Sequence, residues 1–356
     1  MVHGLALPFA LLLTSCVSGA APQAPSAPLS TARTGVWITY WDFARGAARV
    51  AVSEDTIHDV FFFAAQLNAD GLPELALSDE KIRATTQALK RPGRRFWLTL
   101  VNDTVTAETG TPPGAKKILK DPEIVRLLTQ TPALRARLRE RLATLAILCG
   151  VDGVDIDFEN FKPECRDGFC ALIEELKRDL KLRGLLLSVT VEPRIADWSR
   201  DRPGPIDLAA LSRAADRVQI MLYHEHWRKS APGPMASPAW IRRVLDAAFR
   251  HGEKQKIVPV LKLAGMDWSP KDAESVSHQD ALQLAKDRGA KIERDAKDSV
   301  PYFRYRDEGS GEHAVYFEDA ESINAKRQAL EAMGLSSVVF WSLGGEDPDL
   351  LRPAKR

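Results

Sequence analysis

Long apolar runs, excess charge of one sign and metal-ligand spacings are all missing from the 356-residue sequence. No stretch of about 18 apolar residues occurs, so a membrane-spanning helix is not expected. The 49 basic and 48 acidic residues give a net charge of +1, and no basic run stands out, so nucleic acid is not an expected partner. No cluster of Cys, His, Asp and Glu has metal-site spacing, so we predict neither a metal nor a cofactor.

Cysteine is also rare, and the four residues of this type have different predicted roles. Cys149 lies near the end of an apolar helical pattern and is expected in the core. Cys165 and Cys170 are close in sequence. They can form a small disulfide, which an exported protein permits, or remain two free thiols.

The N-terminus predicts export. Residues 5–13 are apolar but too short to span a membrane, and Leu-Thr-Ser-Cys at 13–16 resembles a bacterial lipobox, in which Cys16 would be lipidated. Residues 1–16 would then be the signal peptide, and residues 17–34, rich in Ala, Pro and Ser, a flexible tether. The resemblance, with Val17 after the cysteine, implies the periplasmic face of an outer membrane. An ordinary secretory signal cut before Pro22 is the alternative.

Eight apolar segments separated by helical patterns predict an α/β fold, a (β/α)₈ TIM barrel over residues 35–352. The predicted strands are 35–41, 60–67, 96–101, 151–160, 185–191, 217–223, 257–261 and 337–341. A doubly wound sheet has the same alternation and is the alternative fold.

One region does not fit a simple helix-to-strand step. Residues 302–306 and 313–317 alternate around a turn, which predicts a hairpin within an insertion of about 294–318 between strands seven and eight. Its tyrosines, Tyr302, Tyr305 and Tyr316, could wall a groove at the barrel rim or simply pack the hairpin.

The fourth predicted strand has an unusual pattern. Apolar residues alternate with acids in the run Val154-Asp155-Ile156-Asp157-Phe158-Glu159. Alternation places the three carboxylates on one face, about 6.6 Å apart at roughly 3.3 Å per residue. A face of this kind can simply be solvated, but a parallel strand between two helices is buried on both faces. At least one acid should then keep its proton near neutral pH, as general acid catalysis requires.

Asp152-x-x-Asp155-x-Asp157-x-Glu159 resembles the signature of glycoside hydrolase family 18, the chitinase-like enzymes. Met221-x-Tyr223 is similar to the family's Met-x-Tyr-Asp, with His224 in place of the aspartate. Leu100-Val101-Asn102-Asp103 stands where the chitinases usually have Ser-x-Gly-Gly. That departure, with Phe317-Glu318-Asp319 and the ending Trp341 to Pro348, looks more like the spore-cortex and peptidoglycan-active members.

The resemblance implies a set of site residues. Glu159, also the acid nearest the barrel mouth, would be the acid/base. Asp157 would orient the substrate's N-acetyl group, which attacks the anomeric carbon, and Asp155 would share a proton with Asp157. Tyr223 would contact the intermediate. The expected substrate-binding residues are Trp341 as the sugar floor, Met221, Tyr40, Asn102 and His224.

Several weaker assignments accompany these. Asp152 is out of phase with the other acids and is predicted to be structural. Met221 is equally suited to filling the core. Glu225 could compensate for His224 if the register shifts, and His224 with His226 lacks a third ligand for a metal. Tyr40 and Trp41 could add to the sugar wall.

Together these features predict an exported glycoside hydrolase that cleaves β-1,4-linked N-acetylglucosamine-containing glycan, peptidoglycan or its fragments, with retention. The expected partners are the N-acetylated glycan and, through a lipid anchor only, a membrane. Two alternatives are open. The enzyme could act on chitin or N-glycans, or the chain could bind glycan without cutting it, as the His224 departure allows.

Overall fold

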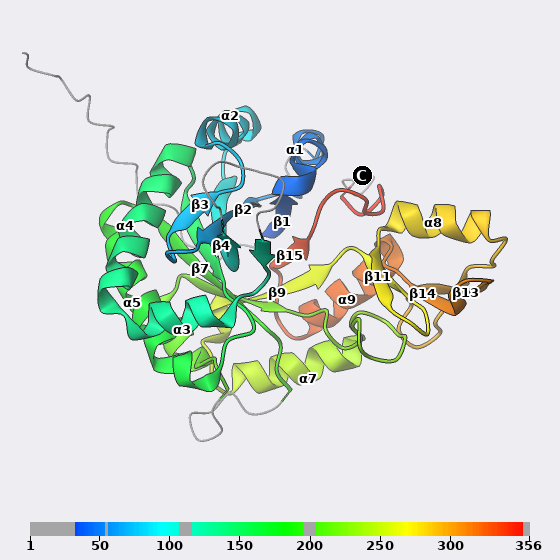
Figure 1. The fold of residues 1–356 in the computed structure, drawn as a ribbon. Coiled ribbons are helices and arrows are strands. Elements are labelled where there is room, and N and C mark those ends of the chain that lie inside the picture. Colours follow the sequence, from blue (N-terminus) through cyan, green and yellow to red (C-terminus); the bar gives the residue numbers. More distant parts are fainter. Residues whose placement is uncertain (1–32, 54–55, 107–115, 196–203, 352–356) are drawn as a thin grey trace, which may run out of the picture.

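The computed structural model describes residues 33–53, 56–106, 116–195 and 204–351, so Cys16 and the predicted signal lie outside the described residues. Eight parallel strands form a closed ring in which each pairs with two neighbours, and pairing of β2 with β4 completes the circle (Figure 1). The predicted (β/α)₈ barrel is therefore confirmed. None of the helices in this part of the chain has the length and apolarity to span a bilayer.

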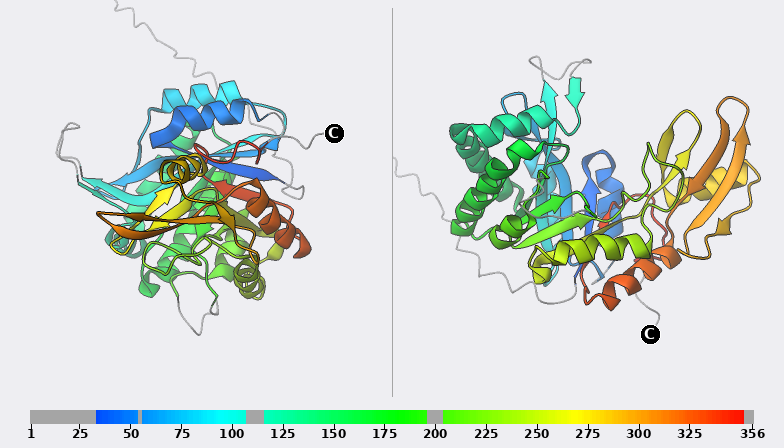
Figure 2. Two further views of the ribbon diagram at one scale, coloured as in Figure 1. Left: turned by 90° about the vertical axis from the view of Figure 1, so that its right-hand side faces the viewer. Right: turned by 90° about the horizontal axis from the view of Figure 1, so that it is seen from below.

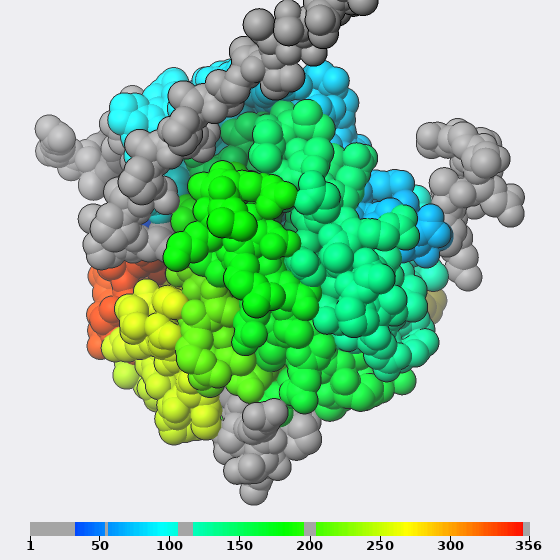
Figure 3. Space-filling model, turned by 90° about the vertical axis from the view of Figure 1, so that its left-hand side faces the viewer, coloured from blue at the N-terminus to red at the C-terminus, as the bar shows by residue number. Residues whose placement is uncertain are grey.

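The barrel strands and their covering helices alternate along the chain, as a right-handed parallel barrel requires. The strands are β1 (Thr34–Thr39), β2 (Asp59–Asn68), β4 (Arg95–Thr106), β6 (Gly153–Asp157), β7 (Leu186–Val191), β8 (Arg217–Met221), β9 (Ile257–Lys262) and β15 (Val338–Trp341). The helices are α1 (Phe43–Ala51), α2 (Asp79–Leu89), α3 (Pro122–Gln130), α4 (Pro132–Cys149), α5 (Arg166–Leu182), α6 (Leu208–Ala214), α7 (Pro238–Phe249) and α9 (Ala320–Ala332). Figure 3 shows the face on which α3, α4 and α5 pack together.

Local sequence explains where the longest of these helices begins and ends. Pro132 occupies the first turn of α4, where its missing N–H costs nothing. Gly150 follows the last turn with φ of 68°, a left-handed conformation that favours glycine. Apolar residues at helical spacing, including Leu138 and Leu142, are fully buried against the strands.

Strand β4 is longer than predicted. It continues through Asn102 and Asp103 to Thr106, because β2 and the short antiparallel strand β5 (Lys116–Ile118) pair with its polar end. The apolar run ends at Val101, so the composition of the following residues gave no indication that the strand continues. The β4–β5 pairing carries the chain back over the mouth of the barrel.

The barrel interior is layered. At the base, the Arg217 guanidinium lies 4.1 Å from the Trp97 ring centroid and 4.6 Å from that of Phe61, and it pairs with Asp59 at 3.3 Å. These aromatic rings begin a small apolar cluster inside the ring of strands, whereas the larger core lies between the strands and the helices. The charged pair at the base closes that end, and the open end lies at the carboxyl ends of the strands.

The insertion between β9 and β15 is an antiparallel sheet, larger than the predicted hairpin. Its strands are β10 (Gly265–Trp268), β11 (Ala273–Val276), β12 (Glu293–Arg294), β13 (Pro301–Asp307) and β14 (Gly311–Tyr316), with α8 (His278–Asp287) packed beside them. The predicted hairpin is β13 and β14. The unit stands to one side of the barrel (Figure 2) and starts at Gly265, where a Cβ would lie 2.1 Å from the Tyr316 carbonyl oxygen.

Candidate active site

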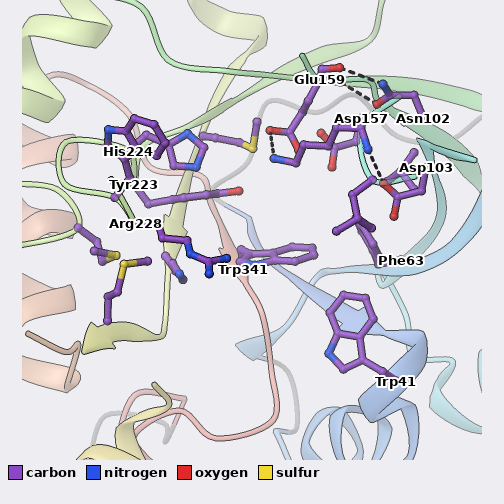
Figure 4. Close-up of a pocket in the computed structure, with 18 of the residues that line it drawn as sticks. Trp41, Phe63, Asn102, Asp103, Asp157, Glu159, Tyr223, His224, Arg228 and Trp341 are labelled. Atoms are coloured by element: carbon purple, nitrogen blue, oxygen red, sulfur yellow. Dashed lines mark hydrogen bonds and ion pairs between the residues drawn. The ribbon is translucent and has the colours of Figure 1, made fainter. Parts of the chain in front are cut away.

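A cavity of about 570 Å³ opens at the carboxyl ends of the barrel strands (Figure 4). Its wall includes residues at or just beyond the ends of β1, β6, β8, β9 and β15, with Phe63 from the middle of β2, residues from the second half of β4, and residues of β5 and β10. Nearly all residues predicted from the sequence as site residues line it, namely Tyr40, Asn102, Asp157, Glu159, Met221, Tyr223, His224 and Trp341. Only Asp155 lies deeper, beneath the cavity floor.

Asp155 is fully buried in a hydrogen-bond network inside the barrel. Its carboxylate accepts from the Thr99 hydroxyl at 3.1 Å, the Thr190 hydroxyl at 3.0 Å and the Gln219 amide at 3.0 Å. Burial raises the pKa of Asp155, and the hydrogen bonds from Thr190 and Gln219 oppose the rise. Among the described residues, no hydrogen bond joins Asp155 to Asp157, so the expected shared proton is not seen in this structure.

Asp157 and Glu159 follow one another on the same face, at and just beyond the end of β6. Burial, reinforced by the charges of Glu159 and Asp155, raises the pKa of Asp157 well above its usual value. One oxygen of Asp157 is buried with no hydrogen-bond partner. An orphaned buried oxygen next to a second carboxyl favours the protonated, neutral form of Asp157.

Two contacts hold Glu159. The Asn102 amide accepts from the Glu159 backbone N–H at 2.9 Å and donates to the Glu159 carbonyl at 2.9 Å, so it fixes the backbone of the acid (Figure 4). The Lys120 ammonium donates to the Glu159 carboxylate at 2.6 Å. Burial raises the pKa of Glu159, and the charge of Lys120 acts against that rise. Asn102 was predicted to bind substrate, but its side chain forms hydrogen bonds with the protein backbone instead.

A second lysine on the β5 side stabilises the rim. The Lys117 ammonium donates to Asp103 and to the Tyr40 hydroxyl, both at 2.9 Å. The Tyr40 hydroxyl is therefore engaged, and its ring contributes to the cavity wall. Tyr40 follows β1 in a 3₁₀ turn (Tyr40–Asp42) rather than in the strand predicted to reach residue 41.

Aromatic rings form one wall of the cavity. Trp341, at the end of β15, lies 4.8 Å from Phe63 and 6.4 Å from Trp41, measured between ring centroids. The Trp341–Ser342 peptide is cis. Trp41 is 60% exposed at the outer edge of the wall. Apolar ring faces at the rim of a polar cavity suit the apolar face of a sugar.

Opposite this wall, β8 supplies Met221 and is followed by Tyr223 and His224. Burial and the nearby carboxylates raise the pKa of Tyr223 well above its usual value, so its hydroxyl is a donor. Burial, with the charges of Lys120 and Lys262, lowers the pKa of His224 to about 4, so the imidazole is neutral at pH 7. Glu225 does not compensate for the missing aspartate, because its carboxylate accepts from the Ser237 N–H at the start of α7.

Four cavity cations were not found from the sequence: Lys117, Lys120, Arg228 and Lys262. Lys120 is 39 residues from Glu159, and only the β4–β5 pairing brings the two together. Lys262 could have been predicted from the sequence, because it directly follows the apolar run of the seventh strand, and barrel enzymes have functional residues at this position.

The weaker predictions have mixed outcomes. Asp152 accepts from the Phe96 N–H, a structural role as predicted, and Cys149 is fully buried in the core. Cys165 and Cys170 are free thiols, so the disulfide alternative is wrong. The insertion tyrosines pack within their own sheet rather than against the cavity. Tyr302 stacks on Tyr316 at 5.2 Å, and the Tyr305 hydroxyl donates to Asp267.

The arrangement defines a class of protein. A parallel barrel with acids of raised pKa in an aromatic-walled cavity has the parts of a glycosidase: a proton donor and a sugar platform. Within the described residues, no group of three or more metal-ligating side chains comes together. The model of the glycosyl hydrolases family 18 matches residues 123–347, and the chain belongs to this family.

Two proteins of Bacillus subtilis are similar to this chain. YdhD, named as a sporulation-specific glycosylase, is 30% identical over 229 residues, which cover 62% of this chain and 54% of that protein. The cortical fragment-lytic enzyme is 28% identical over 229 residues, which cover 62% and 53%. The chain thus spans about half the length of these relatives. As a member of family 18 it is similar to proteins that carry the names glycosylase and cortical fragment-lytic enzyme.

A solved structure supports the fold. A chitinase from Chromobacterium violaceum superimposes with a TM-score of 0.76 over 90% of this chain and 97% of that chain, at 23% identity. This likeness shows the shared barrel.

Proposed function

We propose that the protein hydrolyses β-1,4-linked N-acetylglucosaminyl bonds in peptidoglycan or its fragments, with retention of configuration and with the substrate's own acetamido group as nucleophile. Family 18 enzymes are exceptions to the two-carboxylate scheme of most retaining glycosidases. The substrate class is taken from the relatedness to the cortical fragment-lytic enzyme of Bacillus subtilis.

Each cavity residue has a role in this proposal. Glu159 gives its proton to the leaving oxygen, and later takes one from the water that opens the intermediate. Asp157, beside it, accepts a hydrogen bond from the acetamido N–H and so orients the acetamido group. The positive charge that develops there favours the ionised form of Asp157, which stabilises that charge. The Tyr223 hydroxyl donates to the attacking acetyl oxygen. Trp341 is the floor on which the sugar ring stacks.

The observation that carries the proposal is the position of Glu159. It stands at the cavity surface with its backbone fixed by Asn102, and burial raises the pKa of its carboxyl. A proton donor must combine a raised pKa with access to the substrate. Asp155 has the raised pKa without the access, since it is fully buried below the cavity.

The test compares wild type with Glu159→Gln on N-acetylglucosamine oligomers and on purified peptidoglycan fragments, with products identified by mass spectrometry. Wild type should cleave, and the variant should lose at least 100-fold in kcat, because an amide cannot supply the proton. Unchanged thermal unfolding would show that the variant is folded. Equal activity in the two proteins would refute the role of Glu159, and the preferred substrate separates cell wall from chitin.

A second candidate is a glycan-binding protein without activity. Two observations favour it: a neutral His224 where the family has an aspartate, and the ion pair between Lys120 and Glu159. Binding by wild type and by Glu159→Gln, with cleavage by neither, would support this candidate.

The proposal includes export. Residues 1–32 lie outside the described residues, and the lipobox-like run before Cys16 is its basis. Lipidation of Cys16 would hold the barrel close to a membrane, because only residues 17–32 separate this cysteine from Arg33, which already pairs with Asp59 of the barrel.

A further inference from the structure

Lys262 is placed to touch a bound sugar. It is the last residue of β9, and in the parallel pairing with β15 it lies in register with Trp341. Residues in register on neighbouring strands project to the same side of a sheet. Both side chains line the cavity, so Lys262 stands beside the proposed sugar platform.

The other cations of the cavity each have an ionic partner. Lys117 pairs with Asp103, Lys120 with Glu159, and Arg228 with Asp272 on the rim. Within the described part of the chain, Lys262 forms no hydrogen bond or ion pair. The positive charge of the Lys262 ammonium in the cavity therefore has no ionic partner.

Among the described residues, the acid whose charge acts on Lys262 is already engaged elsewhere. Glu318 is the acid whose charge acts on it, and Glu318 is already engaged by Lys326 and by the Ser322 hydroxyl. His224, on the adjoining side, is neutral and brings no negative charge. A partly buried ammonium without an ionic partner is unfavourable in the unbound protein.

We infer that Lys262 is the binding site for a carboxylate carried by the glycan, and that the ligand class is an N-acetylated sugar with an acidic ether. The lactyl ether of N-acetylmuramic acid is the chemistry that fits. The inference rests on the proposed function, whose substrate it narrows, since chitin has no such carboxylate. The ammonium pairs with that carboxylate when the sugar ring stacks on Trp341.

The experiment measures binding, so its outcome is separate from whether any bond is cut. Isothermal titration uses sulfur-linked tetrasaccharides, which resist cleavage: one of N-acetylglucosamine alone, and one alternating with N-acetylmuramic acid and free of peptide. Wild type is compared with Lys262→Met, Lys262→Arg and the paired-cation control Arg228→Met.

Wild type should prefer the carboxylated glycan, and Lys262→Met should reduce that preference by 10- to 100-fold, the range for a hydrogen-bonded charge. Lys262→Arg should restore most of the preference for the carboxylated glycan. Arg228→Met tests whether removing any cavity cation has the same effect as removing Lys262. Esterification of the lactyl groups tests whether the preference depends on the charge of the glycan. A preference that survives in Lys262→Met, or that appears only when stem peptides are attached, would overturn the inference. So would failure of the carboxylated glycan to bind wild type.

Discussion

The ion pair between Lys120 and Glu159 makes a quantitative prediction about pH. A general acid works only when protonated, so the alkaline limb of kcat/KM follows its ionisation. The ammonium of Lys120, 2.6 Å from the carboxylate, favours the ionised and inactive form. Replacing Lys120 with methionine removes that charge while keeping most of the side-chain length. The pKa of Glu159 should rise, and activity should persist to higher pH.

The size of the shift follows from distance and exposure. At 2.6 Å two unit charges attract by about 1.6 kcal/mol in bulk water and by about 6 kcal/mol at an effective dielectric constant of about 20. The Lys120 side chain is 47% exposed, so solvent screens much of its field and the lower limit is the better guide. At about 1.4 kcal/mol per pH unit, the alkaline limb of Lys120→Met should move up by roughly one pH unit.

The assay is a pH profile of kcat/KM on a soluble oligosaccharide, recorded for wild type, Lys120→Met and Lys117→Met. Lys117 is the matched control, because it lies on β5, three residues before Lys120, but pairs with Asp103 and Tyr40 instead of Glu159. Since Glu159 and Asp157 interact, the limb reports the pair rather than one carboxyl. An alkaline limb that stays in place, or that moves equally in both variants, would refute the reasoning.

Two further predictions concern neighbouring residues. Burial lowers the pKa of Lys262 from 10.5 to about 8, so between these values the unfolded chain binds more protons than the folded one, and stability rises with pH. Lys262→Met should therefore be more stable than wild type by about 3 kcal/mol near pH 7, and this difference in the free energy of unfolding should disappear by about pH 10.5. Urea unfolding at a series of pH values checks this. A difference that does not change with pH would contradict it. Asn102→Ala should lower kcat tenfold or more with little change in KM, because the Glu159 backbone loses its two hydrogen bonds to Asn102. It should also lower the free energy of unfolding by about 1–3 kcal/mol. A change in KM alone would instead indicate that Asn102 contacts the substrate.

Much of the barrel could be predicted because its strands are continuous apolar runs. The run Val60 to Leu67, for example, is mostly buried, and it appears in β2 almost unchanged. The inserted strands β10 and β11 were missed because they have four residues each and are half-exposed, so they carry no clear period. Short strands of this kind are stabilised by their neighbours in the sheet more than by their own composition.

Some residues of the candidate site could also be predicted from the sequence, and others could not. Asp157, Glu159, Tyr223 and Trp341 lie at strand ends, where spacing along one segment is enough to place them. The electrostatic setting was out of reach, because Lys120 reaches Glu159 through the pairing of two other strands. Sequence spacing predicts which acids cluster, but the pKa of each acid depends on cations that arrive from elsewhere in the chain.

The separate core of the inserted sheet has a consequence for substitutions near the cavity. Buried residues such as Phe303, Val315 and Phe317 pack with one another and with α8, apart from the core that joins the barrel strands to their helices. Substitutions within this small core leave the barrel core untouched. Trp268 of the same sheet, however, belongs to a second cluster with Met235, against which Tyr223 packs. Met266 on β10 nevertheless lines the cavity. Substitutions at this edge can therefore alter one part of the cavity wall while the acid and its supporting strands stay unchanged.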